Sequence, residues 1–565
     1  MRIGLLTEGG YPYVGGEPGL WCDRLVRGLG QHEFVVYALS RSERRKVRGP
    51  GSRSGFGFRS RLGAGADPGF GFGWRARRRF AECFGELAQV LCTGPEAGAD
   101  RAGGSGTDGS GQLADRFGRS LYGLAELARD VARDTGGLIG PLRSETAVRA
   151  LEKACRAPGA LRAARAARVP DLLAVADHLE RALRPLSLDW YGDEDLGAVD
   201  LCHATAGGSA ALPGLLAKHF AGVPLLVTEY GVRLREHHLA GAAKPGAGGE
   251  PGLAVPARAL LAAFQGRLAA EVYRQAAVIT SGNAHARRWQ ERCGADRAKL
   301  RTVHPGLPSS RFGEVGEREG PGDPRTLVRV GRVEPSKDLI SLLHAFAEVR
   351  KEEPGARLRI VGALADGPQA AAYLAHCRAL AAHLFPDEAD GAHAVGTNPV
   401  SFDEIGGPEL PRRADAYAAG GVVVLSSVVE GFPISLIEAM FCGRATVSTD
   451  VGAVVEIIGG TGLVVPPRNP RALAQACVAL LRDPGRRARL GAAARARALE
   501  LFTVEQNLAA FDGIYLEIVS HCPVRGEALN EAGVPVPFAR PAEAYVPGRW
   551  AGVRGPGIAL KEALS

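Results

Sequence analysis

Two glutamates eight positions apart are the residues of this chain best suited to holding a polar ligand. Glu430 and Glu438 lie in SSVVEGFPISLIEAMFCG, residues 426–443, where Pro433 suits the first turn of a helix that Gly443 would end. The first amide groups of such a helix have no partner within it and suit a phosphate. Glu438 stands among apolar residues in mid-helix, so its carboxylate needs a polar partner such as a ribose diol.

The spacing of the two glutamates sets a length scale for that ligand. Eight residues of helix span roughly 12 Å, although Glu430 precedes the turn and the true separation stays open. A nucleotide-sugar has this size, with its sugar at Glu430, its diphosphate over the helix start and its ribose at Glu438. The alternative is a surface glutamate beside a helix salt bridge, which a lone pair of glutamates would favour.

A second group of charged residues supports the ligand. In VGRVEPSKDL, residues 330–339, Arg332 and Lys337 flank a proline turn between a strand and a helix. Arginine offers a two-pronged fork and lysine a point charge, which together suit a diphosphate. The spacing is not that of a Walker loop. A basic turn with surface charges is the alternative, but the downstream glutamates favour binding.

Alternating strands and helices place both groups in one predicted domain. Segments such as VDLCHA and PLLVTEYG alternate with helices from about 199, and a second alternation starts at TLVRVGRV, which predicts two doubly wound parallel sheets. The predicted parts are a first domain at 1–312 with a Gly/Arg-rich, partly disordered and helical insertion at about 41–198, a linker at 313–325, a second domain at 326–503, a helix at 504–520 that could return to the first domain, and a Pro/Gly-rich tail at 521–565.

Composition argues against several other classes of protein. The net charge is +8, but 69 basic residues face 61 acidic ones and no nucleic-acid module is recognisable. The 10 cysteines occur singly, without a CxxC pair, which favours reduced thiols in a cytoplasmic protein over a zinc site. No signal peptide or transmembrane run is expected. WYGDEDL, residues 190–196, looks like an acidic surface turn rather than a metal site.

The two charged groups, together with Thr449–Gly452, resemble the donor half of glycosyltransferase family 4. TEGGYPYV near the start, TEYGVRLRE at 228–236 and the long helical insertion resemble its Pel exopolysaccharide subgroup. The resemblance implies an α/β GT-B fold, in which two Rossmann-like doubly wound domains face a central cleft. It also implies a metal-independent enzyme without a cofactor that retains the anomeric configuration.

The resemblance implies roles for individual residues. The catalytic set would be Glu430, Arg332 and Lys337, with the two cations neutralising the diphosphate as the glycosidic bond breaks. Glu430 would hold the donor sugar and Glu438 the ribose. The remaining donor-binding residues would be Gly331, Gly431, Phe432, Pro433 and Ile434.

The glycine-rich loop TEGGYPYVGGEPGLW, residues 7–21, is expected at the cleft edge of the first domain. Gly15 and Gly16 would let the backbone approach a ligand, and Tyr11 and Tyr13 could wall an acceptor pocket. Glu17 would repel a phosphate, so we expect the loop to face an acceptor hydroxyl at least as much as the diphosphate. The other candidates at the acceptor side are His203, Glu229 and Tyr230.

Three positions depart from the family pattern. Tyr230 stands where the family usually has a histidine near the donor sugar, and Pro305-Gly306 replaces an Asn-Gly pair. In the first loop the glycine pair is shifted and Glu17 takes one glycine's place. His203, His237 and His238 are alternatives for the missing imidazole, although a histidine at a strand end is more often structural.

Together with these residues, the resemblance implies a retaining glycosyltransferase that moves a hexose from a nucleotide-sugar, expected to be UDP-linked, to a glycan or small-molecule acceptor. A role in exopolysaccharide synthesis, with peripheral association with a membrane assembly complex, is the finer expectation. The alternatives are a non-catalytic nucleotide-sugar-binding partner of a polysaccharide assembly complex and a GT-B sugar-nucleotide epimerase. No nucleic acid, metal or cofactor is expected as a partner.

Overall fold

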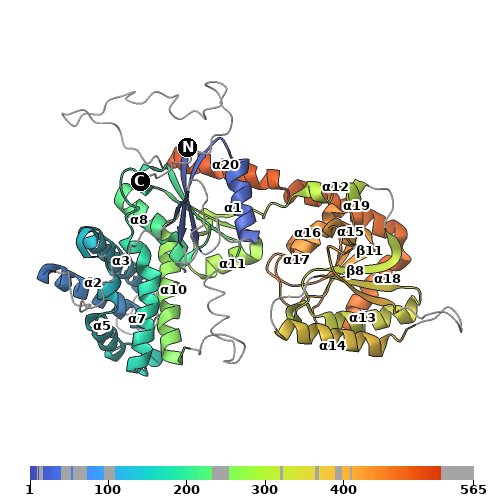
Figure 1. Cartoon of the computed structure of the whole chain (residues 1–565), viewed down its shortest axis with the longest axis horizontal. Helices are drawn as coiled ribbons and strands as arrows, with labels where there is room; N and C mark the ends of the chain where they lie inside the picture. The colour runs from blue at the N-terminus through green and yellow to red at the C-terminus, as the bar shows by residue number, and fades with distance from the viewer. Residues whose placement is uncertain are drawn as a thin grey trace, which may run out of the picture. The chain divides into compact units, whose positions relative to one another are not determined.

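The chain forms two compact units, each built around one parallel sheet (Figure 1). The computed structural model describes residues 1–8, 11, 17–39, 52–54, 73–94, 108–135, 137–231, 253–317, 322–362, 368–387, 398–407 and 410–522. The first unit comprises Met1–Ser281, Ala286–Thr302 and the chain from Phe511 onward, and the second comprises Gly282–His285 and Val303–Ala510.

The first unit contains a 7-stranded parallel sheet in the order β3-β2-β1-β4-β5-β6-β7. Its strands are β1 (Arg2–Glu8), β2 (Glu33–Leu39), β3 (Ser52–Ser54), β4 (Leu201–Ala204), β5 (Leu225–Glu229), β6 (Val278–Ser281) and β7 (Leu300–Thr302). The strand order reverses between β1 and β4, where Leu5 pairs with both Val36 and His203. Ligands of such sheets bind beyond the carboxyl ends of the strands at this point, and the loop after β1 leaves the sheet there.

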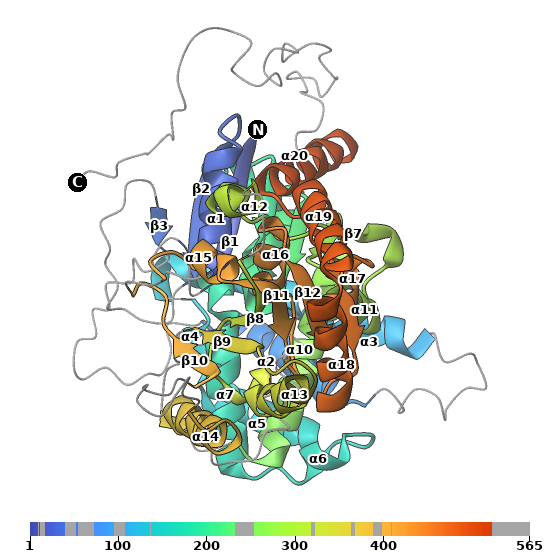
Figure 2. The same ribbon diagram turned by 90° about the vertical axis from the view of Figure 1, so that its right-hand side faces the viewer.

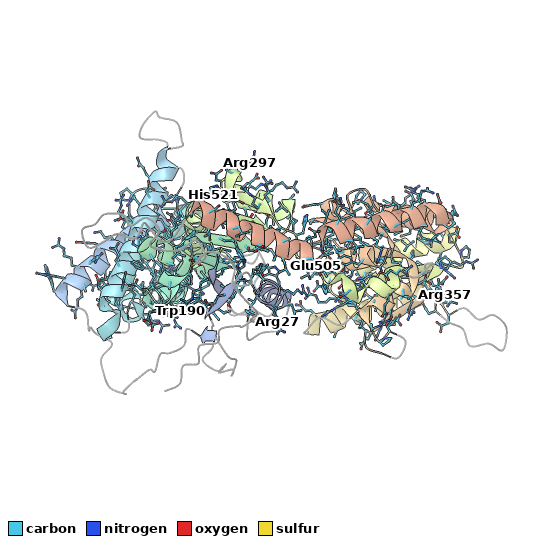
Figure 3. All side chains as sticks on the ribbon, turned by 90° about the horizontal axis from the view of Figure 1, so that it is seen from above. Arg27, Trp190, Arg297, Arg357, Glu505 and His521 are labelled. Carbon is cyan, nitrogen blue, oxygen red and sulfur yellow. The ribbon has the colours of Figure 1, made fainter. Side chains whose placement is uncertain are left out.

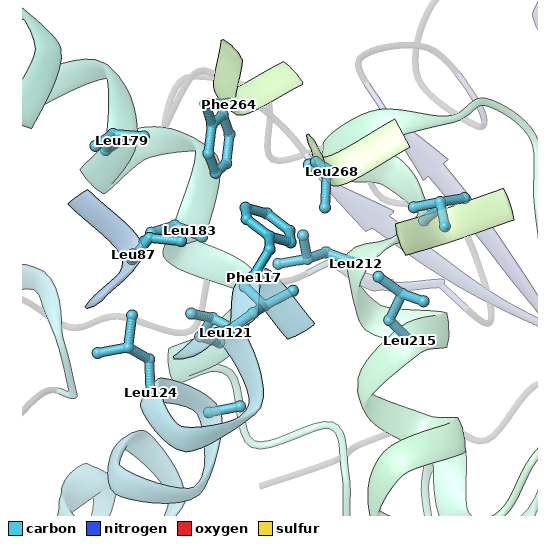
Figure 4. Close-up of a cluster of buried hydrophobic side chains, with 14 of the residues drawn as sticks. Leu87, Phe117, Leu121, Leu124, Leu179, Leu183, Leu212, Leu215, Phe264 and Leu268 are labelled. Carbon is cyan, nitrogen blue, oxygen red and sulfur yellow. The ribbon is translucent and has the colours of Figure 1, made fainter. Parts of the chain in front are cut away.

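The helical insertion shares its core with the helices that cover this sheet. It consists of α2 (Trp74–Cys92), α3 (Asp108–Thr135), α4 (Ile139–Leu142), α5 (Glu145–Arg156), α6 (Arg162–Arg165) and α7 (Val169–Leu183), and it packs on α8 (Leu212–Ala221) and α10 (Val255–Gln275). Leu87, Phe117 and Leu183 of the insertion are fully buried together with Leu212 and Phe264 of the covering helices (Figure 4). The insertion is therefore part of the first unit's core.

Parts of the predicted insertion at about 41–198 are more ordered than its Gly/Arg-rich composition indicates. α2 begins at Trp74 and α3 at Asp108, each within or next to a Gly-rich stretch. Helices with poor intrinsic propensity form when their later turns pack on a core, as Leu121 and Leu124 of α3 do. β3 adds an edge strand that the composition did not reveal. Residues 41–51, 55–72, 95–107 and 136 of the insertion lie outside the described residues.

The second unit contains a 6-stranded parallel sheet in the order β10-β9-β8-β11-β12-β13. Figure 2 labels β8 to β12 of this sheet. Its strands are β8 (Asp323–Val330), β9 (Arg357–Val361), β10 (Val400–Asp403), β11 (Gly420–Leu425), β12 (Ala445–Thr449) and β13 (Leu463–Val465). Successive side chains enter different cores: Leu327 and Val422 belong to one, Val328 and Val423 to the other. One core lies under α13 (Leu339–Glu352), α14 (Pro368–Leu384) and α18 (Pro470–Arg482), the other under α15 (Arg413–Ala418), α16 (Ile434–Phe441), α17 (Val454–Ile458) and α19 (Pro484–Leu501).

The segment predicted as a linker, residues 313–325, contains regular structure. It contains α12 (Gly313–Glu317) and the first residues of β8. Phe312 and Val315 are 4% and 3% exposed in the core of the second unit. These apolar side chains pack there, and the main segment of the second unit begins at Val303, ahead of the predicted boundary at 312.

A last helix, α20 (Val504–His521), begins in the second unit and continues into the first; Figure 3 labels Glu505 and His521 near its ends. In the first unit Tyr515 is fully buried, and its hydroxyl lies 2.8 Å from Nδ1 of His203. The predicted α/β GT-B fold class, with two Rossmann-like doubly wound units and a helical insertion in the first, is confirmed. Of the predicted tail, residues 523–565 lie outside the described residues.

Candidate functional site

The candidate site of the second unit lies where the strand order reverses, at the carboxyl ends of β8 and β11. Gly331 follows β8 with a φ of 139°, a conformation that favours glycine. Its amide donates to the Val361 carbonyl oxygen at 3.0 Å. A Cβ on Gly362 would collide with the Gly331 carbonyl oxygen. Two glycines therefore let the loop after β8 lie tightly over the end of β9.

Arg329 lies beneath this loop and was missed by the sequence analysis. It is 1% exposed, and its guanidinium donates to the carbonyl oxygens of Gly331 and, at 2.7 Å, Arg332. Burial lowers the pKa of Arg329 to about 10, while the negative charge of Glu430 opposes that shift. The guanidinium therefore stays charged at neutral pH. The available signal was a charged residue inside the apolar strand TLVRV, which needs buried partners.

The structure brings together two of the three predicted catalytic residues. Lys337, at the end of the 3-10 turn η7 (Pro335–Lys337), places Nζ 2.6 Å from Oε1 of Glu430, and the two side chains are only 14% and 11% exposed. Ser427 donates to the same oxygen at 2.7 Å. Ser426 donates to the Lys337 carbonyl oxygen at 2.8 Å, which ties the two loops together. An ammonium group and a carboxylate thus share one small polar site.

The third predicted catalytic residue, Arg332, extends away from this pair. Its side chain is 67% exposed, and its guanidinium lies 3.9 Å from Glu334. Burial alone would raise the pKa of Glu334, but the hydrogen bond from Ser336 and the positive charges of Arg332 and Lys337 outweigh burial and lower it. The exposed position leaves Arg332 able to reach a ligand over the loop.

The predicted donor-binding turn is held from behind by the segment Thr449–Gly452. Gly431, Phe432 and Pro433 lead into α16, which starts at Ile434. Thr449 donates to the Ser427 carbonyl oxygen at 2.6 Å. Gly452 has a φ of 59°, and a Cβ there would collide with the Glu430 carbonyl oxygen. The segment therefore fixes the backbone that carries Glu430.

Glu438 lies in the interior of the same unit, 7% exposed on α16. Tyr417 donates to its Oε2 at 2.6 Å, and Nε of Arg413 lies 2.9 Å from the same oxygen. Glu438 is therefore bound by protein groups, as the salt-bridge alternative expects. The same two groups also fix the orientation of its carboxylate.

His203 does not have the exposed position expected of an acceptor-side residue. It is fully buried in β4, with Nδ1 2.8 Å from the Tyr515 hydroxyl and Nε2 2.7 Å from the Thr228 hydroxyl. Burial lowers its pKa to about 3. A neutral ring with both nitrogens engaged is structural, since it offers no nitrogen to an acceptor.

The other first-unit candidates divide between buried and half-buried positions. Glu229 is 2% exposed and accepts from Tyr273 at 2.6 Å and Gln290 at 3.2 Å. Tyr230 is half-buried and meets the edge of Trp21, with ring centroids 5.2 Å apart. Tyr230 therefore lies beside the start of α1 (Glu17–Gly28), which the glycine-rich loop leads into.

Only part of that loop can be described. Tyr11 is half-buried, and its carbonyl oxygen accepts from Thr7 at 2.9 Å. Burial, and then the charge of Asp23, raise the pKa of Tyr11. Tyr13, Gly15, Gly16 and the Glu17 side chain lie outside the described residues, as do His237 and His238.

Two further observations concern the described residues as a set. They contain no group of three or more His, Cys, Asp or Glu side chains close enough to hold a metal ion. Among the same residues, no helix has the length and apolar character needed to cross a membrane.

Comparison with known proteins adds evidence on the second unit. Residues 324–483 match the family model described as glycosyl transferases group 1. The second unit contains a glycosyl transferases group 1 domain. Residues 1–49 and 144–298 match a domain of unknown function, DUF3492.

Curated relatives carry glycosyltransferase names. The chain is 31% identical over 238 residues to a D-inositol 3-phosphate glycosyltransferase of Kineococcus radiotolerans, covering 39% of this chain and 52% of that one. It is 32% identical over 235 residues to the protein of that name from Streptomyces bingchenggensis, covering 40% and 49%. The chain spans about half the length of these relatives.

Solved structures are similar at a low level. The Anabaena protein Alr3699/HepE in complex with UDP and glucose has a TM-score of 0.42 and 18% identity, with 57% of this chain and 79% of that one covered. A sucrose-phosphate synthase from Thermosynechococcus elongatus has a TM-score of 0.48 and 15% identity, with 92% and 99% covered. Similarity at this level carries no argument about function.

Proposed function

We propose that this chain is a retaining glycosyltransferase that moves a hexose from a nucleotide-sugar, UDP-linked, to a glycan or small-molecule acceptor. The observation that supports it best is the contact between Lys337 and Glu430. It lies beyond β8 and β11, where sheets of this type bind ligands, within the segment that matches glycosyl transferases group 1. A cation for the leaving diphosphate and a carboxylate for the sugar hydroxyls stand side by side.

In the proposed reaction the bond between the anomeric carbon and the diphosphate oxygen breaks, and negative charge grows on the diphosphate. Lys337 would exchange Glu430 for the diphosphate, and Arg332 would close on it from its exposed position. Arg329 adds a fixed positive charge beneath the loop at no cost in reorganisation. Glu430, released from Lys337, would accept hydrogen bonds from the donor sugar.

Retention needs no second carboxylate in this proposal. The acceptor hydroxyl would attack on the face from which the diphosphate leaves, and the leaving phosphate would take its proton. This differs from retaining hydrolases, in which two carboxyl groups flank the bond. Glu438, oriented by Tyr417 and Arg413, is proposed to bind the ribose. No metal or cofactor takes part.

The acceptor is proposed to bind at the first unit, where Tyr11 follows β1 and Tyr230 contacts Trp21 of α1. The curated relatives are named for a phosphorylated small acceptor, D-inositol 3-phosphate. The resemblance of TEGGYPYV to the Pel subgroup instead suggests exopolysaccharide synthesis beside a membrane assembly complex. We propose a cytoplasmic location, which suits 10 cysteines without a CxxC pair.

Release of the nucleotide tests the proposal. The full chain is incubated with UDP- and GDP-sugars and a panel of sugar and inositol phosphate acceptors, and free UDP or GDP is measured with and without a chelator. We expect acceptor-stimulated UDP release that the chelator does not change. Tight binding of UDP-glucose without release under any condition would refute the transferase. Conversion of the donor sugar without an acceptor would indicate an epimerase.

A further inference from the structure

A cavity of about 540 Å³ lies in the second unit, away from the site described above. It is lined by Gly421 and Ala445, at the amino ends of β11 and β12, and by residues of α12 and α19. The Lys337–Glu430 pair lies beyond the carboxyl ends of the strands, so the cavity is at the opposite edge of the sheet. Its volume is in the range of small-molecule sites.

Arg444 is the unusual residue of this cavity. It is 6% exposed, and its Nε is buried without a hydrogen-bond partner. No ion pair or hydrogen bond of its guanidinium is found among the described residues. Burial lowers the pKa of Arg444. A mostly buried cation without a protein partner is costly, and a ligand of opposite charge would reduce that cost.

Two further arginines line the same cavity. Arg487 is 6% exposed and donates to the Leu480 carbonyl oxygen at 2.9 Å. Arg495 donates to the Phe441 carbonyl oxygen at 2.6 Å, and its other arm lies 3.2 Å from Glu317, which is 75% exposed. Among the described residues that line the cavity there is no aspartate or glutamate. The lining thus has an excess of positive charge.

The backbone makes room for these guanidinium groups. A Cβ on Gly316 would collide with the Arg495 guanidinium, and a Cβ on Gly491 would collide with the Gly443 carbonyl oxygen. Gly443 has a φ of 64°, which turns the chain from α16 directly into Arg444. Close backbone approach at these glycines brings three arginines around one space.

We infer that this cavity binds a small phosphate-bearing anion, such as a phosphomonoester or pyrophosphate, through Arg444. The fork of an arginine matches two phosphate oxygens. This site is separate from the proposed donor site and does not depend on the proposed transfer reaction.

Calorimetric titration of the full chain with inorganic phosphate and with pyrophosphate, in chloride buffer, tests the inference. The titrations use a Lys337→Met background, in which binding at the proposed donor site is weakened. We expect Arg444→Met to weaken the remaining binding by about tenfold or more, the value of a charge-assisted fork. Arg489→Met, an exposed position on α19, should leave it unchanged. Absent binding, or binding that Arg444→Met does not weaken, would overturn the inference.

Thermal unfolding gives a second measurement that also checks folding. Because Arg444 is buried and unpaired, Arg444→Met should keep or raise Tm in phosphate-free buffer. Phosphate or pyrophosphate should raise the Tm of the chain that retains Arg444 and not that of the variant. If Arg444→Met does not fold, Arg444→Lys keeps the charge and removes the fork, and it should still weaken binding. Equal responses to the anion in all variants would contradict the inference.

Discussion

Removing either partner of the Lys337–Glu430 contact should have opposite effects on UDP binding. In the proposed site Lys337 must leave Glu430 to reach the diphosphate. Lys337→Met should therefore weaken the binding of both UDP and UDP-glucose. Glu430→Gln removes the competitor for the lysine, so it should tighten UDP binding while it weakens the extra contribution of the sugar.

The size of these effects follows from the burial of the pair. At 2.6 Å and an effective dielectric constant of about 20, the gross attraction is about 6 kcal/mol, and desolvation offsets most of it. Exposed pairs contribute about 0–1 kcal/mol, and removing one partner of a fully buried pair costs about 3–5 kcal/mol. With 14% and 11% exposure, and Glu334 still 3.7 Å from Lys337, each single substitution should cost about 2 kcal/mol of stability.

For ligand binding we expect Lys337→Met to raise the Kd of UDP by about tenfold to a hundredfold, the loss of a charge-assisted contact of about 1.5–3 kcal/mol. Glu430→Gln should lower the Kd of UDP by about fivefold. In this variant Lys337 no longer has to break its contact with Glu430, which costs about 1 kcal/mol, before it binds the diphosphate. The ratio of the Kd values for UDP-glucose and UDP should rise by about tenfold in this variant. Both ligands are titrated by calorimetry, and stability is measured by urea unfolding.

A matched control lies on the helix that follows Lys337. Lys351 pairs with Glu348 at 2.7 Å, but both are largely exposed, at 68% and 48%. Lys351→Met should change neither UDP affinity nor stability by more than about 1 kcal/mol. If Glu430→Gln weakens UDP and UDP-glucose equally, or if Lys337→Met has no effect on either, the assignment of the site is wrong.

Three further predictions concern single interactions. Because burial lowers the pKa of His203 to about 3, against about 6.5 when unfolded, the unfolded chain binds the extra proton between these values. The free energy of unfolding should then fall by about 1.4 kcal/mol per pH unit toward acid, and His203→Gln should flatten that slope in urea unfolding. Glu438→Gln should raise the Kd of UDP about tenfold and Tyr417→Phe a few-fold; unchanged affinity in both would make Glu438 a structural ion-pair partner. Ser336→Ala should raise the pKa of Glu334 in an NMR titration, because the hydrogen bond that helps to lower it is lost.

Local chemistry made much of the second unit predictable. Pro433 and Gly443 bound a short helix whose limits can be deduced from their backbone preferences, and α16 lies between them. Local backbone preferences do not predict the contact between Lys337 and Glu430. It requires β8 and β11 to be neighbours in the sheet, a long-range property that periodicity does not contain.

The positions of other residues were not predicted from the sequence, for physical reasons. Val315 looks like a linker residue until a core is available to receive it. His203 lies inside the strand β4, and its surroundings depend on Tyr515, which lies far along the chain. Arg329 was the one residue that sequence reasoning could have found, since a charge within an apolar strand has to be satisfied by the fold.

The last helix has a consequence for the order in which this protein is made. Phe511 packs against Trp21 with ring centroids 5.6 Å apart, and Tyr515 closes over His203 in the same unit. At about 5–20 residues per second, a ribosome produces Trp21 long before either aromatic residue. The interior of the first unit therefore lacks these two aromatic side chains until the second unit has been synthesised. An early release of the chain would leave the N-terminal portion incomplete, so translation to the end of α20 is itself a condition for a finished first unit.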